Sequence, residues 1–290
     1  MAPSATEQTA SAAKGHVQEE HRSGDPSLAF VRDEESLPPV FTDKYEERKF
    51  LKHRLALAYR IFAQNGFADG VAGHITLRDP VDPTSFWVNP FGLHFSLIKD
   101  EDLIRVDHTG TVVEGGNNLR LNYEIHNARP DVLCAAHCHS IYGGAMCSTG
   151  RTLDMLTQDF CVFYEDHAYY PNFAGLVLAT DEGREIAECL GPRKAALLGN
   201  HGLLTAGPTI EATIGWFVLL EKLCKVQLAA DASSAGSGRP LVTIGEAESR
   251  STHAAIGHGD AGYFMGLPLF QVAEREFGEQ TYLGRGLRPI

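Results

Sequence analysis

Two short apolar segments that end at histidines constrain this chain most. Residues 132–139 form an apolar run whose last positions include His137 and His139, two residues apart. Side chains two apart on a strand point to the same face, so both imidazoles can reach one metal ion. A second apolar run, residues 195–203, contains His201 just before a glycine. Three imidazoles suit a catalytic metal that keeps an open coordination position.

An accidental origin of the histidine pair is the alternative. The chain has 13 His, so one such pair can occur by chance on a solvated strand face. Both histidine elements end apolar runs, however, and an unpartnered polar ring is costly to bury there. The context therefore favours metal binding.

Composition narrows the class of protein. With 290 residues, of which 43% are hydrophobic, the chain can bury one substantial core in one or two domains. The net charge of −12 and the lack of a basic stripe argue against nucleic acid and favour a small-molecule ligand. No signal peptide and no run of about 18 apolar residues is found, which predicts no membrane segment and a cytoplasmic location. The six cysteines show no CxxC spacing and indicate small buried hydrophobes in a reducing compartment.

The first 40 residues are rich in Ser, Ala and Glu, which predicts a disordered arm or one that lies over another subunit. Residues 41–290 are expected to form one domain, with a C-terminal extension from about 235 and a flexible break over 233–240. Short strands over 74–78, 85–89 and 103–107 predict a small antiparallel sheet, with a hairpin at Gly110. Apolar periodicity predicts helices over 45–66, 122–128, 141–149, 181–190 with Asp181 as its cap, 209–230 and 266–277. Helices that alternate with strands predict one α/β layered domain.

The three histidines stand in a wider sequence context. With residues 128–131 (Ala-Arg-Pro-Asp) before the pair and 200–202 (Asn-His-Gly) after it, the chain resembles the class II aldolase/adducin family over roughly residues 45–245. Residues 88–94, 140–143 and 158–167 resemble its adducin-like branch more than its sugar-phosphate aldolases. The resemblance implies a single α/β/α layered domain, in which helices flank a central, mainly antiparallel sheet. It also implies a homotetramer with active sites near the subunit interfaces.

The resemblance also implies a metal and a reaction. His137, His139 and His201 match the three zinc-binding histidines of the family. A divalent metal, zinc by default, would polarise a carbonyl group and stabilise the enediolate that forms when the neighbouring carbon–carbon bond breaks.

The usual general base of the family is absent from its usual place. Where the aldolases carry Ser-Ser-Glu, this chain has Gly116, Asn117 and Asn118, and an amide cannot exchange a proton as a carboxylate does. The candidates to replace this general base are His74 and three residues of the segment after residue 158, namely Asp159, Glu165 and His167. For the histidines a merely local hydrogen-bonding role is the alternative, and for Glu165 simple solvent exposure.

The phosphate-binding positions are changed as well. Phe91-Gly92 stands where the family has Thr-Gly, and Val71 to His74 replaces its Thr-Ala-Gly-Asn loop. The loss of small hydroxyl and amide donors favours a non-phosphorylated substrate, an aromatic compound or a keto acid. The expected substrate-binding residues are Phe91, Gly92, Asn117, Asn118, Tyr142 and Tyr164.

Three functions follow from this reading. The first is a metal-dependent lyase that acts on a non-phosphorylated carbonyl or keto-acid substrate by aldol-type cleavage or decarboxylation. The second is a non-haem Fe(II) oxygenase that decarboxylates oxidatively at the same three-histidine site. The third is a non-catalytic adducin-like interaction module.

Overall fold

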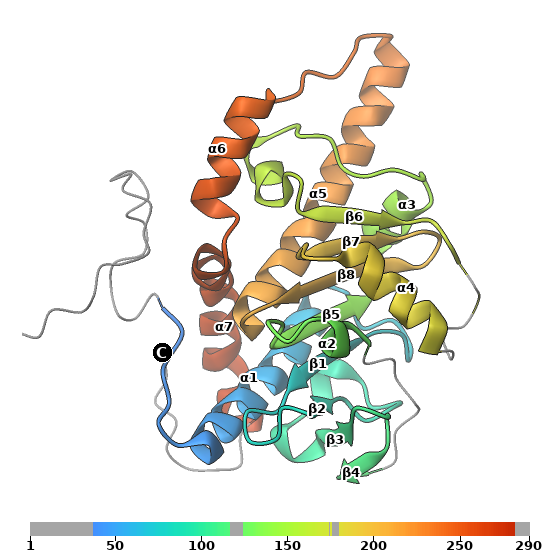
Figure 1. The fold of residues 1–290 in the computed structure, drawn as a ribbon. Helices are drawn as coiled ribbons and strands as arrows, with labels where there is room; N and C mark the ends of the chain where they lie inside the picture. The colour runs from blue at the N-terminus through green and yellow to red at the C-terminus, as the bar shows by residue number, and fades with distance from the viewer. Residues whose placement is uncertain (1–36, 117–123, 174, 176–179, 282–290) are drawn as a thin grey trace, which may run out of the picture. The chain divides into compact units, whose positions relative to one another are not determined.

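An eight-stranded sheet forms the centre of the fold (Figure 1). The computed structural model describes residues 37–116, 124–173, 175 and 180–281, so the arm expected over residues 1–40 lies outside the described residues except for its last four. The strands are β1 (His74–Arg78), β2 (Ser85–Val88), β3 (Ile104–Asp107), β4 (Val112–Glu114), β5 (Cys134–Cys138), β6 (His167–Tyr170), β7 (Ala195–Leu198) and β8 (Gly202–Gly207). Their order across the sheet is β4-β3-β2-β1-β5-β8-β7-β6. All neighbours pair antiparallel except β6 and β7, which run parallel.

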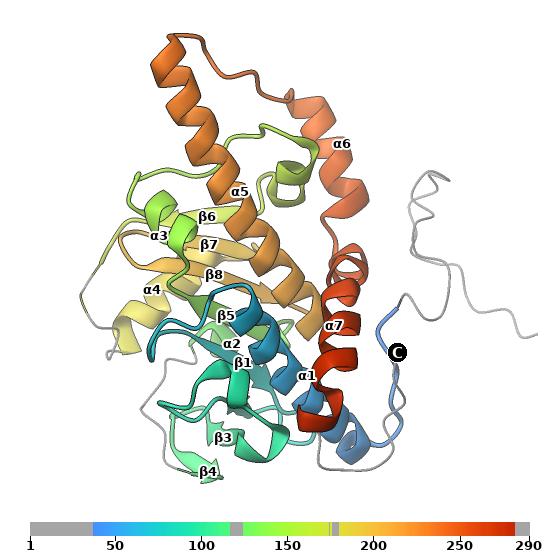
Figure 2. The ribbon, with the colours of Figure 1, turned by 180° about the vertical axis from the view of Figure 1, so that it is seen from behind.

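Helices cover both faces of this sheet (Figures 1 and 2). They are α1 (Lys44–Gln64), α2 (Glu124–Ala128), α3 (Ile141–Cys147), α4 (Thr180–Leu190), α5 (Ile210–Ser237), α6 (Glu246–Ile256) and α7 (Gly259–Thr281), with 3-10 turns η3 (Phe95–Leu97), η4 (Asp100–Asp102) and η5 (Gln158–Phe163). Helices α2 and α4 lie on one face, and α1, α3 and α5 lie on the other, where α7 packs against α1 and α5. The predicted α/β/α layering around a mainly antiparallel sheet is confirmed.

The two faces of the sheet carry separate cores. Along β5, Cys134, Ala136 and Cys138 join the large cluster under α1 and α5, whereas Ala135 joins the smaller cluster under α4. Strand geometry requires this alternation, because successive side chains point to opposite faces. Every residue of β5 is buried, which explains why the run looks continuously apolar in the sequence.

Most of the expected elements are present, and two predictions at element ends were wrong. Helix α5 continues through Ser237 and ends at Gly238, whose φ of 67° is left-handed, so the flexible break expected over 233–240 begins later. Helix α4 begins at Thr180, which places Asp181 inside the helix and not at its cap. Helix α6 had no counterpart in the prediction. Among the described helices, none has the length and apolar composition needed to cross a membrane.

Helix α7 reaches the backbone of α5 because both helices have glycines where they cross. A Cβ on Gly266 would lie 2.1 Å from the carbonyl oxygen of Glu211, and one on Gly262 would lie 2.5 Å from the Trp216 ring. Further along α7, Phe270 and Ala273 belong to the large core. Helix α7, which lies within the expected C-terminal extension, is therefore packed into the same core as the sheet.

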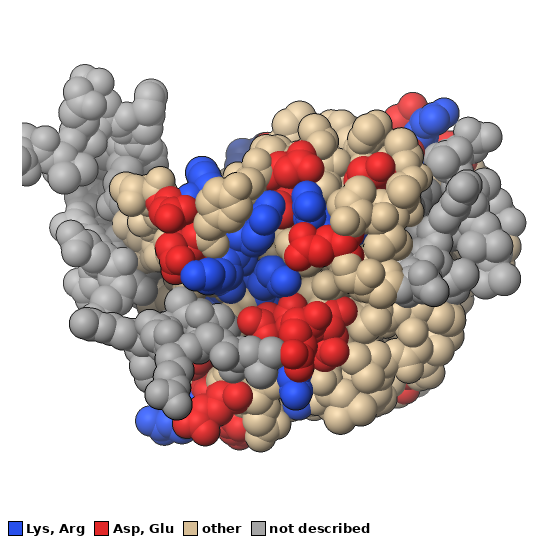
Figure 3. All heavy atoms as spheres, turned by 90° about the horizontal axis from the view of Figure 1, so that it is seen from below, with Lys and Arg blue, Asp and Glu red and all other residues tan. Residues whose placement is uncertain are grey.

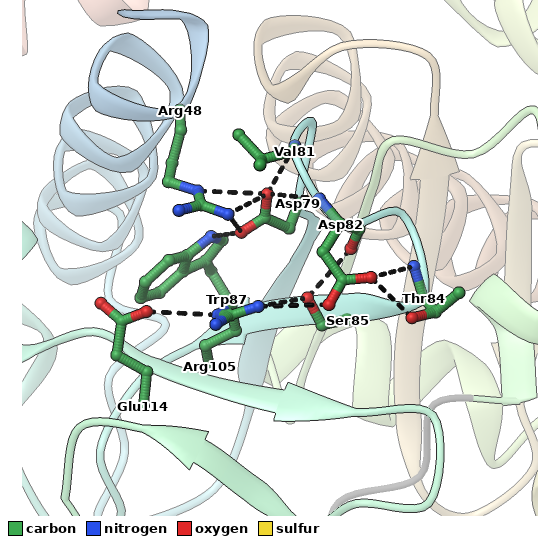
Figure 4. A network of polar contacts seen from close by, with 9 residues as sticks. All are labelled: Arg48, Asp79, Val81, Asp82, Thr84, Ser85, Trp87, Arg105 and Glu114. Atoms are coloured by element: carbon green, nitrogen blue, oxygen red, sulfur yellow. Dashed lines mark hydrogen bonds and ion pairs between the residues drawn. The ribbon is translucent and has the colours of Figure 1, made fainter. Parts of the chain in front are cut away.

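A buried carboxylate organises the loop between β1 and β2 (Figure 4). Asp79 is fully buried and accepts hydrogen bonds from Arg48 of α1, from the indole Nε1 of Trp87 at 2.9 Å, and from the backbone N–H groups of Val81 and Asp82. These contacts tie the first helix to the loop that joins β1 and β2, two interior strands of the sheet.

Beside this carboxylate lies a more exposed set of charges. Asp82 accepts from Arg105 at 3.2 Å, and Arg105 also contacts Glu114 at 3.2 Å.

On the face seen from below, basic side chains lie together and are bordered by acidic ones (Figure 3). The described residues of this face thus offer no uncompensated basic surface of the kind that a phosphate backbone requires.

Candidate metal centre

Strand pairing brings the three histidines to one end of the central strands. His137 lies in β5, and His139 follows the last residue of that strand. His201 lies in the tight turn between β7 and β8. Asn200 adopts a left-handed φ of 54° in this turn, a conformation that asparagine tolerates better than most residues. A Cβ on Gly202 would lie 2.5 Å from the carbonyl oxygen of Cys138, so this glycine allows the turn to approach β5.

The three imidazoles form a compact group. The ring centroids of His137 and His201 are 4.6 Å apart, those of His139 and His201 are 4.8 Å apart, and those of His137 and His139 are 5.2 Å apart. One ring nitrogen from each residue lies within 4.8 Å of the other two. Within the described ranges, this is the group of histidine, cysteine or carboxylate side chains whose spacing could hold a metal ion.

The donor set fits a divalent metal. The Nδ1 atom of His137 lies 2.8 Å from the carbonyl oxygen of Leu203, which can only accept a hydrogen bond, so Nδ1 carries the proton and Nε2 is the available ligand atom. Burial lowers the pKa of all three histidines, to about 4 for His201, and the neighbouring imidazoles lower the pKa of His137 and His201 further. Neutral imidazole is the form that binds metal.

The group opens into a cavity of about 330 Å³. Its polar lining consists of the three histidines, His74 and Asn200; its apolar lining consists of Ile125, Phe173, Ile186, Leu198 and Leu204. The Phe173 ring centroid is 6.0 Å from that of His201. Neither Lys nor Arg is among the described residues that line this cavity.

One predicted acid/base residue lies beside the group. His74 begins β1 and pairs with His137 across the two strands, and their ring centroids are 5.4 Å apart. Burial, and then the nearby His201 and His139, lower the pKa of His74 to about 4. His74 is therefore a neutral imidazole at pH 7 on the wall of the cavity.

The other predicted acid/base residues are not brought to the group within this chain. His167 begins β6, where its Nδ1 donates to the carbonyl of Phe163 at 2.7 Å and its Nε2 accepts from the N–H of Leu153 at 3.0 Å. Both ring nitrogens thus bind backbone, which is a structural role. Glu165 is exposed and pairs with Arg250 of α6 at 2.9 Å.

The remaining predicted residues of this segment lie close by. Asp159 is exposed on η5, and the Tyr164 hydroxyl accepts from Arg250 at 3.3 Å. Neither residue lines the cavity in this chain.

The predicted substrate-binding residues are also dispersed. Phe91 is 49% exposed, Gly92 has a left-handed φ of 85° in the turn after β2, and neither lines the cavity. Tyr142 is exposed in the first turn of α3. Asn117 and Asn118 lie outside the described residues. Sequence reasoning missed Phe173, because a single aromatic residue in a loop carries no periodic signal.

A layered α/β fold with three neutral imidazoles at the ends of its central strands is typical of enzymes that use a divalent cation. More specifically, residues 53–228 match the family described as Class II Aldolase and Adducin N-terminal domain. The match spans more than half of the chain, and the chain belongs to this family. Class II aldolases bind a divalent metal, with which the three histidines are compatible.

Three similar proteins illustrate this membership. The chain is 44% identical over 243 residues to "Decarboxylase NovR" of Streptomyces niveus, covering 81% of this chain and 88% of the relative. It is 47% identical over 211 residues to "4-hydroxy-3-prenylphenylpyruvate oxygenase/4-hydroxy-3-prenylbenzoate synthase" of Streptomyces roseochromogenus subsp. oscitans, covering 70% and 76%. A solved structure titled "L-fuculose 1-phosphate aldolase from Glaciozyma antarctica PI12" aligns with a TM-score of 0.77 and 43% identity, covering 85% and 97%. The family and these relatives make the chain an aldolase-like lyase.

Proposed function

We propose that the chain is a metal-dependent lyase that acts on a non-phosphorylated carbonyl or keto-acid substrate by aldol-type carbon–carbon cleavage or decarboxylation. The observation that carries this proposal is the three-histidine group in the lining of a largely apolar cavity. In this proposal His137, His139 and His201 hold the cation, with zinc as the default ion. The bound cation would polarise the substrate carbonyl and stabilise negative charge on its oxygen.

The residues of the chain itself supply position and proton transfer. The carbonyl of Leu203 holds the His137 ring in the tautomer that leaves Nε2 for the metal. His74 stands next to this group, and no hydrogen bond to either of its ring nitrogens is formed by the described residues. Because a neutral imidazole can accept a proton, we assign to His74 the removal of a proton from the substrate, the task of the family glutamate that Asn118 replaces.

The cavity lining favours an apolar substrate body. Ile186, Leu198, Leu204 and Phe173 offer aliphatic and aromatic surface, and the described lining has no cation that would compensate a phosphate group. One of the two Streptomyces relatives is named as a decarboxylase, and the name of the other refers to a prenylated phenylpyruvate. An aryl-substituted keto acid is therefore the substrate class that we propose, although the solved relative is titled as an aldolase of a phosphorylated sugar.

Metal removal tests the proposal. We expect dialysis against a chelator to abolish turnover of an aryl keto acid, and zinc to restore it, because the cation carries the charge stabilisation. L-fuculose 1-phosphate, assayed in parallel, should react much more slowly. Turnover that survives complete metal removal, or a preference for the phosphorylated sugar, would contradict the proposal.

A second candidate function is oxidative decarboxylation with Fe(II). It is favoured by the relative that is named as an oxygenase. Three neutral imidazoles with open positions also suit Fe(II). The same assay under anaerobic conditions separates the two candidates. Activity that requires both iron and oxygen selects the oxygenase, and activity with zinc without oxygen selects the lyase.

Two further measurements address the oligomeric state and the alternative of a non-catalytic, adducin-like role. We propose a cytoplasmic homotetramer, as the resemblance to the family implies. Light scattering coupled to gel filtration should give four times the 31.6 kDa mass of one chain. If the purified protein contains no metal and takes up none, the interaction module becomes the better account.

A further inference from the structure

A glutamate outside the cavity holds the segment that directly follows His139. The carboxylate of Glu221, on α5, accepts the hydroxyl of Ser140 at 2.5 Å and the N–H of Gly143 at 2.6 Å on Oε2, and the N–H of Tyr142 at 2.9 Å on Oε1. Glu221 is 8% exposed and Ser140 is 1% exposed. This three-bond contact links the longest helix to the chain that bears a candidate metal ligand.

The contact substitutes for the usual cap of a helix. Ser140 occupies the N-cap position of α3, but its side chain does not bond to the N–H groups of its own helix. Glu221 accepts two of those N–H groups instead, together with the Ser140 hydroxyl. All three partners are neutral donors, and the ion pairs among the described residues include none to Glu221. Burial of a carboxylate costs desolvation, and these three hydrogen bonds offset that cost.

Two of the three histidines are connected to this contact. His139 precedes Ser140 in the chain. On the other side, Gly143 lies against β8, where a Cβ would come within 2.5 Å of the Leu203 side chain. The carbonyl of Leu203 is the acceptor that orients His137. The backbone that Glu221 holds thus continues directly from His139 and packs against Leu203, the residue that orients His137.

We propose that Glu221 is a positioning residue for the metal centre. By holding Ser140, Tyr142 and Gly143, it fixes the backbone after β5 so that the His139 imidazole faces those of His137 and His201. The inference rests on the proposed metal site. Glu221 does not touch the substrate cavity, and it acts through His139.

The test is the substitution Glu221→Gln, which keeps the side-chain volume. A glutamine has one acceptor oxygen, and its amide would direct N–H groups at donors. We expect zinc affinity, measured by competition with a chelating dye, to fall about 10–100-fold, as is typical when a partner behind a metal ligand is lost. The absorption spectrum of the Co(II)-loaded protein should change too, because the geometry around the cation relaxes.

The matched control is Glu211→Gln on the same helix. Glu211 is also buried, but it binds Arg54 of α1 at 2.8 Å, far along α5 from the histidines. Its substitution should lower the unfolding temperature and leave zinc affinity and the Co(II) spectrum unchanged. Equal loss of zinc affinity in both variants would overturn the proposal, since it would reveal general destabilisation.

Wild-type affinity and spectrum in Glu221→Gln would also overturn it. If that variant does not fold, Ser140→Ala removes one of the three bonds and keeps the charge, and we expect a loss of zinc affinity of about tenfold; no loss would overturn the proposal. These measurements need no turnover. A wild-type protein that binds zinc but has no lyase activity contradicts the proposed reaction alone, whereas one that binds no metal contradicts both proposals.

Discussion

Replacing His201 with alanine is expected to lower turnover about 10³-fold, with the protein still folded. The three imidazoles would share one cation, and removal of one donor leaves the ion weakly held. A bound cation contributes several kcal/mol to the stabilisation of transition-state charge, and about 1.4 kcal/mol corresponds to a factor of ten in rate. Steady-state kinetics combined with metal analysis of the purified variant measures both consequences.

The matched control is His167→Ala, which removes a histidine that the sequence also proposed for the site. Both ring nitrogens of His167 bind backbone, so its loss leaves the Leu153 N–H without its acceptor and the Phe163 carbonyl with the Asp166 N–H as its remaining donor. We expect a decrease in the free energy of unfolding of about 1–3 kcal/mol and unchanged metal content. A loss of turnover as large as that in His201→Ala, at full metal content, would restore the catalytic role that the sequence suggested for His167.

The contrast between these histidines shows what the sequence could predict. The spacing of His137 and His139 is informative because residues two apart on a strand point to the same face of the sheet. The glycine after His201 marks a tight turn. His167 gave no such information. Strand β6 was not predicted, and because it runs parallel to β7, His167 pairs with Ala195 at the start of β7, whereas His201 follows the end of that strand. Which end of a strand faces a site depends on pairing, which sequence spacing does not encode.

The parts that escaped prediction depend on contacts between distant segments. The small residues from Ser233 to Ser237 predict a break, yet they continue α5. Phe173 reaches the cavity from a loop, and Ile186 does so from α4. The sequence analysis did not single out Glu221, and only the folded chain shows its bonds to Ser140 and Gly143. Local patterns thus located the candidate metal ligands, and tertiary packing determined what surrounds them.

Substitution of Asp79 by alanine is expected to cost about 3–5 kcal/mol of unfolding free energy, the typical result of removing one member of a buried ion pair. Asp79 is 0% exposed and accepts from Arg48, Trp87 and two backbone N–H groups, so its removal leaves all of these donors with unmet hydrogen bonds (Figure 4). Urea unfolding followed by fluorescence, at equal protein concentration for each variant, measures the change.

The neighbouring Asp82 provides the comparison, because it lies in the same loop and also pairs with an arginine. Its side chain is 45% exposed, and its pair with Arg105 at 3.2 Å is open to water and salt. Exposed pairs typically contribute up to about 1 kcal/mol, so Asp82→Ala should cost much less than Asp79→Ala, and added salt should reduce its cost further. Equal costs for the two variants would mean that burial is not what makes Asp79 important. In that case the link between α1 and the loop from β1 to β2 would depend on the turn itself and not on the buried carboxylate.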